Sequence, residues 1–206
     1  MFLEAEVLTA LNIGEAVSTK ISTLNELKKH VEKRLLENKL RDFIYANPWI
    51  ISPEWERFAK EISLTSVIKK AGVDNFPDEI YKGRVDMVLG SGSQLVVLEF
   101  MRPGLELDKD HLNRFDDYII TIKSSLDSQT GVTPTGDKYT VVAGYLIADN
   151  EKQTAANTMK IKQLSENRKY AWTWDTLIGR ALKQWEEFLE ILKKRNPNDD
   201  RIKNLK

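Results

Sequence analysis

The chain has 206 residues, of which 41% are hydrophobic and 30% are charged, so it can form a core and is too apolar to be disordered throughout. It lacks cysteine, which excludes disulfide bonds and cysteine-bound zinc and favours a cytoplasmic location. Its 31 basic residues balance its 31 acidic residues, so any contact with nucleic acid must come from a local patch and not from the overall charge.

The N-terminal segment contains apolar residues but also Glu4, Glu6 and Glu15, and it has no basic leader. We therefore expect neither a signal peptide nor association with a membrane. From Val17 to Leu35, apolar residues recur at intervals of three and four, which predicts a helix with a narrow apolar seam. We interpret residues 1–36 as a helical stalk that joins this chain to a preceding part of a longer protein and that can link copies in a homo-oligomer.

The first helix after the stalk is predicted over Glu37–Tyr45. It is expected to end at Asn47, because Pro48 disfavours the helical conformation in the residue before it. Farther along, Arg84–Leu89 and Gln94–Phe100 are rich in Val, Leu and Met and flank a short turn of serine and glycine, which predicts a β-hairpin.

The second half of the chain continues with helices and strands. Asp108 is expected to cap a helix whose apolar stripe, over residues 112–126, suits packing against a sheet. A polar loop over residues 127–138 follows, and Asp175 is expected to cap the last helix. Two further apolar strands are predicted at Tyr139–Ile147 and Tyr170–Thr173.

This order of elements predicts an α/β fold with a mixed (α+β) sheet. Because strands alternate with helices, we expect one domain with a three-layer core over residues 37–195. Residues 196–206 are polar and are expected to form a frayed tail.

Two acids are expected to meet on the hairpin. A two-residue turn at residues 92–93 places Asp86 directly opposite Glu99. Such side chains lie about 5 Å apart, where two like charges are unfavourable unless something compensates them. A magnesium ion would do so, because Mg²⁺ takes oxygen ligands, usually one or two carboxylates with water and phosphate. Alternatively, the two acids belong to a structural ion network with Arg84 or Arg102.

The sequence around these acids, Gly83-Arg84-Val85-Asp86 and then residues 96–104, resembles the core of the PD-(D/E)XK restriction-endonuclease-like superfamily, and within it the Shedu-type nuclease domain of bacterial defence proteins. The likeness covers most of residues 37–195, including the Asn-Pro-Trp that ends the first helix and the Trp-Asp-Thr-Leu that starts at Trp174. Similar segments occur at the C-terminus of bacterial proteins with a heat-shock-chaperone-like or histidine-kinase-like ATPase module. The resemblance thus implies a restriction-endonuclease-like core and an N-terminal ATPase module in the parent protein.

The resemblance also implies roles for individual residues. Asp86 and Glu99 would bind Mg²⁺ or Mn²⁺, and Glu37 would be the helical acid that completes the site. The signature lysine, two residues after the second acid, is replaced by Met101, whose thioether neither positions nor activates water. Arg84 faces Met101 in the same hairpin count and would orient phosphate, although a guanidinium stays protonated and is no general base.

Two functions follow from these residues. The first is Mg²⁺-dependent hydrolysis of phosphodiester bonds in DNA by an anti-phage nuclease with a degenerate active site. The alternative is a catalytically inactive nuclease-like module that binds nucleic acid or protein within a larger ATPase or defence protein. A purely structural oligomerisation module, based on the seam of the stalk, is a third hypothesis.

The histidines and three of the tryptophans are further candidates for site residues. His111 lies in the first turn of an acidic helix start, which favours helix capping over metal binding. His30 lies among lysines on the stalk, as expected for a solvated face. Trp49, Trp55 and Trp185 have apolar neighbours, which favours core packing over base stacking.

Overall fold

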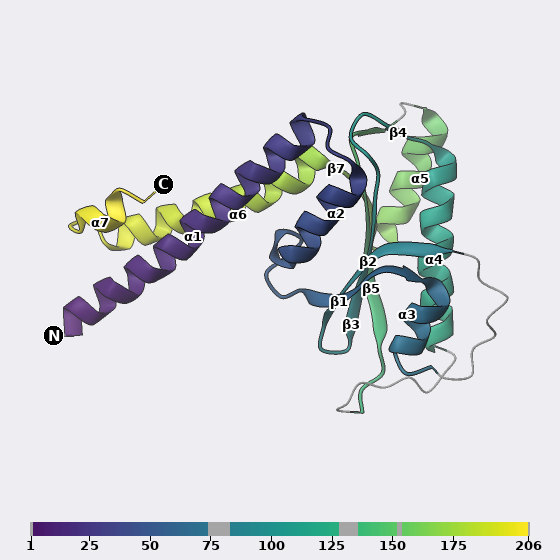
Figure 1. Cartoon of the computed structure of the whole chain (residues 1–206), viewed down its shortest axis with the longest axis horizontal. Coiled ribbons are helices and arrows are strands. Elements are labelled where there is room, and N and C mark those ends of the chain that lie inside the picture. Colours follow the sequence, from purple (N-terminus) through teal and green to yellow (C-terminus); the bar gives the residue numbers. More distant parts are fainter. Residues whose placement is uncertain (1, 74–82, 128–135, 152–153, 206) are drawn as a thin grey trace.

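The computed structural model describes residues 2–73, 83–127, 136–151 and 154–205. A five-stranded sheet, in the order β1-β2-β3-β5-β7, lies between helices on both of its faces, and a pair of long helices projects from it (Figure 1). The fold is therefore mixed α/β, as the sequence predicts. Within the described ranges, no helix is both long and apolar enough to cross a membrane.

The sheet is antiparallel on one side and parallel on the other. β1 (Glu56–Ser63), β2 (Arg84–Ser91) and β3 (Gln94–Phe100) are antiparallel neighbours. β5 (Thr140–Ala148) pairs in parallel with β3, and β7 (Lys169–Thr173) pairs in parallel with β5. A separate pair of short parallel strands is formed by β4 (Glu106–Leu107) and β6 (Asn150–Glu151).

The β2-β3 hairpin has the predicted register. Ser91 pairs with Gln94, and Val88 pairs with Val97. Gly92 in the turn has a φ of +57°, a conformation that residues with a Cβ rarely adopt, so glycine suits this position. β3 is buried over all but its first residue, as expected for a central strand covered on both faces.

Helices cover both faces of the sheet (Figure 1). On one face, α3, α4 and α5 enclose a core that contains Val88 and Val97. On the other face, α1, α2 and α6 enclose a core that contains Met87 and Leu98. The bounds on the first face are α3 (Leu64–Lys70), α4 (Lys109–Asp127) and α5 (Ala155–Glu166). Those on the second face are α1 (Phe2–Glu32), α2 (Glu37–Ala46), the 3₁₀ turn η1 (Pro48–Ile50) and α6 (Trp174–Arg195).

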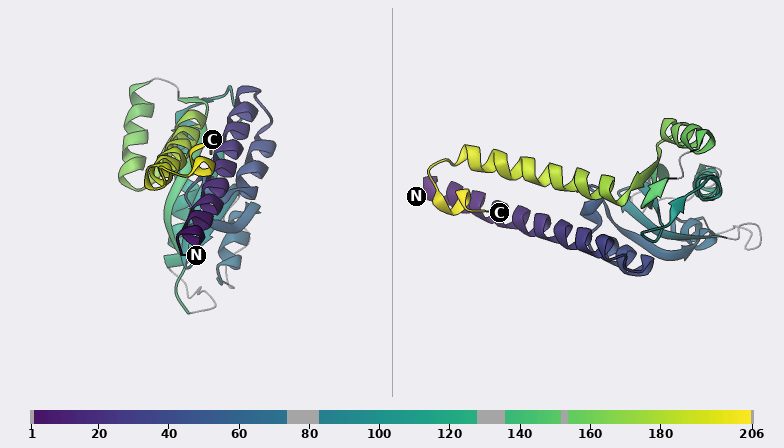
Figure 2. Two further views of the ribbon diagram at one scale, coloured as in Figure 1. Left: turned by 90° about the vertical axis from the view of Figure 1, so that its left-hand side faces the viewer. Right: turned by 90° about the horizontal axis from the view of Figure 1, so that it is seen from above.

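The stalk consists of two helices, because α6 runs alongside α1 away from the sheet (Figure 2). α1 begins well before the predicted Val17–Leu35 segment, and the seam residues Val17, Leu24 and Val31 are buried. The polar tail forms α7 (Asp200–Lys203), in which Ile202 is fully buried. The prediction of a frayed tail is therefore wrong for this part, since one apolar residue finds a place against the stalk.

The cap of the last helix also differs from the prediction. Thr173, and not Asp175, is the N-cap of α6, and its hydroxyl accepts a hydrogen bond from the Thr176 N–H at 3.0 Å. The cap predicted at the start of α4 is confirmed, because Asp108 Oδ1 accepts from the His111 N–H at 3.1 Å. Most of the predicted polar loop, residues 128–135, lies outside the described residues.

Candidate functional site

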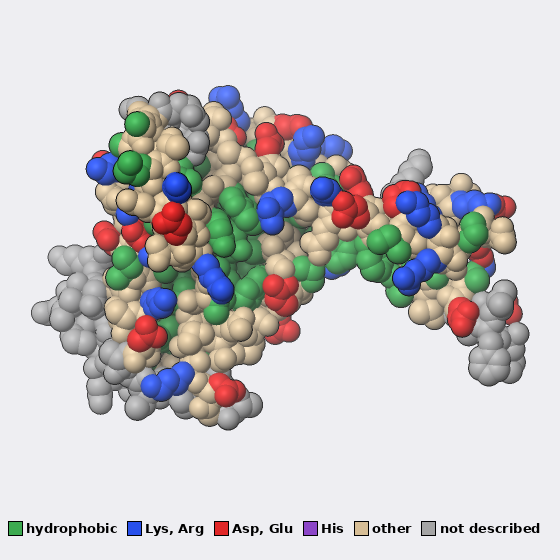
Figure 3. Space-filling view, turned by 180° about the vertical axis from the view of Figure 1, so that it is seen from behind, with side chains coloured by type: hydrophobic (Ala, Val, Ile, Leu, Met, Phe, Trp, Pro, Cys, Tyr) green, Lys and Arg blue, Asp and Glu red, His purple; other side chains and the backbone are tan. Residues whose placement is uncertain are grey.

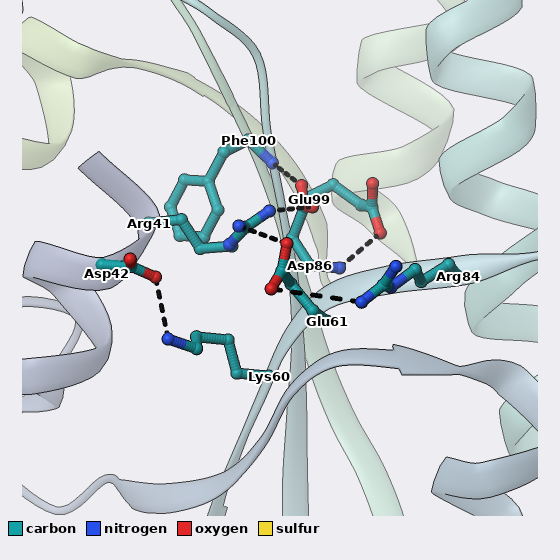
Figure 4. Close-up of polar contacts among 8 residues, drawn as sticks. All are labelled: Arg41, Asp42, Lys60, Glu61, Arg84, Asp86, Glu99 and Phe100. Carbon is teal, nitrogen blue, oxygen red and sulfur yellow. Dashed lines mark hydrogen bonds and ion pairs between the residues drawn. The ribbon is translucent and has the colours of Figure 1, made fainter. Parts of the chain in front are cut away.

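Asp86 and Glu99 lie at the end of the hairpin, one position beyond the last paired residues, Met87 and Leu98. At this position, hydrogen bonds from backbone N–H groups to the two carboxylates take the place of backbone–backbone hydrogen bonds between the strands. The Asp86 N–H donates to Glu99 Oε1 at 3.2 Å, and the Phe100 N–H donates to Asp86 Oδ2 at 2.9 Å (Figure 4). Both carboxylates line one pocket, so the two strands present them to the same space.

Arg41 of α2 bridges two acids at this site. Its Nη1 donates to Asp86 Oδ1 at 3.2 Å and its Nη2 donates to Glu61 Oε1 at 2.5 Å (Figure 4). Only 7% of the Arg41 side chain is exposed, compared with 18% for Asp86 and 43% for Glu61. Its Nε is buried and has no hydrogen-bond partner in the described part of the chain. A single buried guanidinium therefore links acids of two strands.

Glu61 adds a third acid beside Asp86 and Glu99, on strand β1. Its neighbours in β1 pair with Met87 and Val85, which places Glu61 opposite Asp86. Glu61 has a φ of +49°, an uncommon conformation for a residue other than glycine. Strain of this kind is found at functional sites, where the surroundings hold the residue in place. Glu61, Asp86 and Glu99 thus occupy matching positions on β1, β2 and β3.

The site destabilises the negative charge of two of its acids. Burial, and then the charge of Asp86, raise the pKa of Glu99 to about 8. Burial and the charge of Asp86 also raise the pKa of Glu37, against the opposing effects of Arg41 and Arg114. Glu37 lines the same pocket, so α2 brings the predicted auxiliary acid to the pair. A proton or a cation is needed to compensate these carboxylates.

Arg84 and Met101 both line the pocket, but they differ in burial. The Arg84 side chain is 62% exposed, and its Nη2 lies 4.0 Å from Glu61 Oε2. Met101 is only 4% exposed and belongs to the core beneath α4. Its N–H donates to the Ile147 carbonyl at 2.7 Å, and its carbonyl accepts from Trp174 Nε1 at 3.2 Å. The position that the resemblance assigns to the signature lysine is thus occupied by a packed core residue.

α4 forms the opposite wall of the pocket, whose volume is about 310 Å³. It contributes Arg114, whose charge acts against the raised pKa of Glu99. It also contributes Tyr118, whose pKa is raised by burial and by the charge of Glu99. His111 borders the pocket, but its Nδ1 lies 2.6 Å from Asp108 Oδ1, so it is engaged at the helix cap.

The carboxylates of the site are of the chemical type that binds a divalent cation, but they are not arranged as a complete set of ligands. The carboxylates of Asp86, Glu99 and Glu37 are oxygen ligands of the kind that Mg²⁺ prefers. In the described ranges, however, no three His, Cys, Asp or Glu side chains are placed so that they could hold a metal ion together. Both oxygens of Asp86 are already engaged, one by Arg41 and one by the Phe100 N–H. A cation would therefore compete with Arg41 for Asp86.

Sequence analysis did not identify Arg41, Glu61, Arg114 or Tyr118. Arg41 follows Glu37 by four residues, so helical spacing alone could have placed both on one side of α2. Glu61 gave no such signal, because its strand was not predicted.

Comparison with known proteins does not assign the chain to a family. No family model matches it, and no curated protein is significantly similar to it. The resemblance to the PD-(D/E)XK superfamily therefore stays a prediction, and function has to be argued from the site itself.

Proposed function

We propose that this chain is a nuclease-like domain of the PD-(D/E)XK kind that hydrolyses phosphodiester bonds in DNA with the help of Mg²⁺ or Mn²⁺. The observation that carries the proposal is the meeting of Asp86 and Glu99 in one pocket at the ends of adjacent strands. With its pKa raised to about 8, Glu99 holds a proton at neutral pH that a divalent cation would replace. A mixed sheet with helices on both faces supports a restriction-endonuclease-like core.

Each residue of the site would have a role that follows from its chemistry. Asp86 and Glu99 would hold the cation, and Glu37 would bind its water. The cation, when bound, supplies an activated water molecule and neutralises charge that develops on the phosphodiester. Arg84, with its exposed guanidinium at the rim, would contact the substrate phosphate from the side of β1.

A second function, an inactive module that binds nucleic acid or protein, is favoured by Met101 and Arg41. Because Met101 is packed in the core, no ammonium group stands on β3 beside the acids. Arg41 already neutralises Asp86 without any metal. In such a module Arg84 and Arg114 would contact phosphate and no bond would be cleaved.

The proposed parent protein and its assembly rest on the resemblance and on the stalk. Part of the seam of α1 is already buried within this chain, since Val17 and Leu24 are hardly exposed and α1 packs along α6. A homo-oligomer through the stalk, a role in anti-phage defence and an N-terminal ATPase module stay predictions.

Calorimetry with Mn²⁺ and Mg²⁺, combined with a DNA cleavage assay and a DNA shift assay, tests the two functions. If the chain is a nuclease, Glu99→Gln and Asp86→Asn abolish cation binding and cleavage, while Glu166→Gln, an exposed acid of α5, changes neither. DNA retention without cation binding favours the inactive module. Cleavage that is unchanged in Glu99→Gln would remove the catalytic proposal.

A further inference from the structure

A second pocket, of about 590 Å³, lies between η1, β5, β7 and the first turns of α6. On the side of the molecule seen in Figure 3, apolar side chains gather in a hollow next to the base of the stalk. The pocket is separate from the carboxylates. Leu146 pairs with Glu99 in the adjacent strand, so its neighbour Tyr145, which lines the second pocket, faces the other side of the sheet.

Three aromatic rings from adjacent strands form a continuous surface at this edge of the sheet. Tyr145 lies 5.3 Å from Tyr170 and 4.6 Å from Trp172, and the last two lie 5.9 Å apart, measured between ring centroids. All three residues are partly exposed. Aromatic rings that serve only as core are usually covered, whereas these residues are partly exposed, and Tyr145 and Trp172 line the pocket, where a flat group can contact them.

A cation without an ion pair lies beside the rings. The Arg180 guanidinium lies 4.7 Å from the Trp172 ring centroid, and no ion pair of Arg180 occurs among the described residues. Of the two acids of the pocket, Glu187 pairs with Lys183 at 3.8 Å. Glu54 accepts a hydrogen bond from Ser52 and keeps its negative charge, which, besides burial, acts to raise the pKa of Tyr145. Of the two cations that line the pocket, Arg180 is therefore the one that is free to contact an anionic group of a ligand.

We propose that this pocket binds a nucleobase that carries a phosphate group. The base stacks on the exposed faces of the tyrosine and tryptophan rings, and Arg180, held beside Trp172, donates hydrogen bonds to the phosphate. A neutral proline-rich peptide would leave the arginine unused. The same chemistry is offered by a free nucleotide and by an unpaired base of a single strand. The site does not depend on the proposed nuclease function.

Titration calorimetry and tryptophan fluorescence of the full chain test this site with adenosine monophosphate, adenosine, inorganic phosphate and a six-nucleotide single strand of deoxyadenosine. We expect the monophosphate to bind about tenfold more tightly than adenosine and to quench fluorescence, because only it engages both the rings and Arg180. If the hexamer binds at least tenfold more tightly than the monophosphate, the natural ligand is a strand. If the monophosphate binds as tightly as the hexamer, the ligand is a free nucleotide.

Two variants separate the contributions of stacking and charge. Trp172→Leu abolishes the quenching and lowers affinity about tenfold or more. Arg180→Gln, a change of an exposed side chain that leaves folding intact, reduces the monophosphate to the affinity of adenosine. Arg195→Gln, an exposed cation at the far end of α6, is the matched control and has no effect. The proposal is overturned if no nucleotide binds saturably, if phosphate alone binds as tightly, or if Arg180→Gln binds like the parent.

Discussion

Replacement of Arg41 by methionine tests the electrostatic centre of the carboxylate site. Methionine keeps the aliphatic volume but removes the guanidinium that bonds Asp86 Oδ1 and Glu61 Oε1. Loss of one partner of a buried ion pair costs roughly 3–5 kcal/mol, because the other charge is left without compensation. Glu61 is 43% exposed and can be solvated, whereas Asp86 is 18% exposed and cannot be fully solvated.

We therefore expect Arg41→Met to lower the free energy of unfolding at neutral pH by about 3 kcal/mol, near the lower end of that range. For a chain of this length, such a loss corresponds to a fall in Tm of roughly 6–12 °C. Because the variant frees Asp86 Oδ1 for a cation, Mn²⁺ should restore stability to the variant more than it adds to the parent. The gain is roughly 3 kcal/mol when free Mn²⁺ exceeds its Kd a hundredfold.

Urea unfolding followed by circular dichroism, with and without Mn²⁺, measures both effects. Lys60→Met is the matched control, because Lys60 of β1 contacts Asp42 of α2 at 2.8 Å, and these two side chains are 32% and 50% exposed, compared with 7% for Arg41. It should cost less than about 1 kcal/mol. Equal losses in the two variants would refute the view that Arg41 neutralises the site. An equal response of parent and variant to Mn²⁺ would refute competition between Arg41 and the cation.

Three further predictions concern single side chains. Since burial raises the pKa of Glu99 above its unfolded value, the folded state keeps a proton that the unfolded state loses. The free energy of unfolding should then fall between about pH 5 and pH 8, by roughly 1 kcal/mol per pH unit, in the parent but not in Glu99→Gln. In Gly83→Ala, a Cβ would lie 2.8 Å from the Tyr118 ring, so thermal unfolding should show a loss of about 1–3 kcal/mol and a displaced tyrosine. Burial acts to raise the pKa of Asp116, but its bonds with Lys160 and Lys169 outweigh this effect, so the pKa is lowered. Asp116 should therefore contribute stability that is lost at acid pH. Asp116→Asn should unfold more easily than the parent at pH 7 and match it near pH 2.

The hairpin could be predicted because its register depends on local information. A two-residue turn and a count of positions set Ser91 against Gln94, and the same count brought Asp86 next to Glu99. The helix stripes were equally local, since three-and-four spacing is written into the sequence. Contacts between residues that lie close together in the sequence could thus be predicted from the sequence.

The rest of the site depends on contacts between distant segments. β1 was not predicted, because charged residues interrupt its pattern and Glu61 leaves the extended conformation altogether. Arg41 reaches Asp86 across 45 positions in the chain, and only the packing of α2 against the sheet decides that contact. The tail gave a similar error, since Ile202 is a single apolar residue whose burial depends on the distant stalk.

The replacement of the expected lysine by Met101 and the presence of Arg41 have one physical explanation. An ammonium group on β3 would compensate Glu99 and Asp86 from the side of α4, but Met101 fills that volume with an apolar side chain. Compensation then has to come from elsewhere. Arg41 supplies it to Asp86 from α2, whereas Glu99 is left to a proton. A cation that binds to both carboxylates must therefore displace the proton of Glu99 and compete with Arg41 for Asp86.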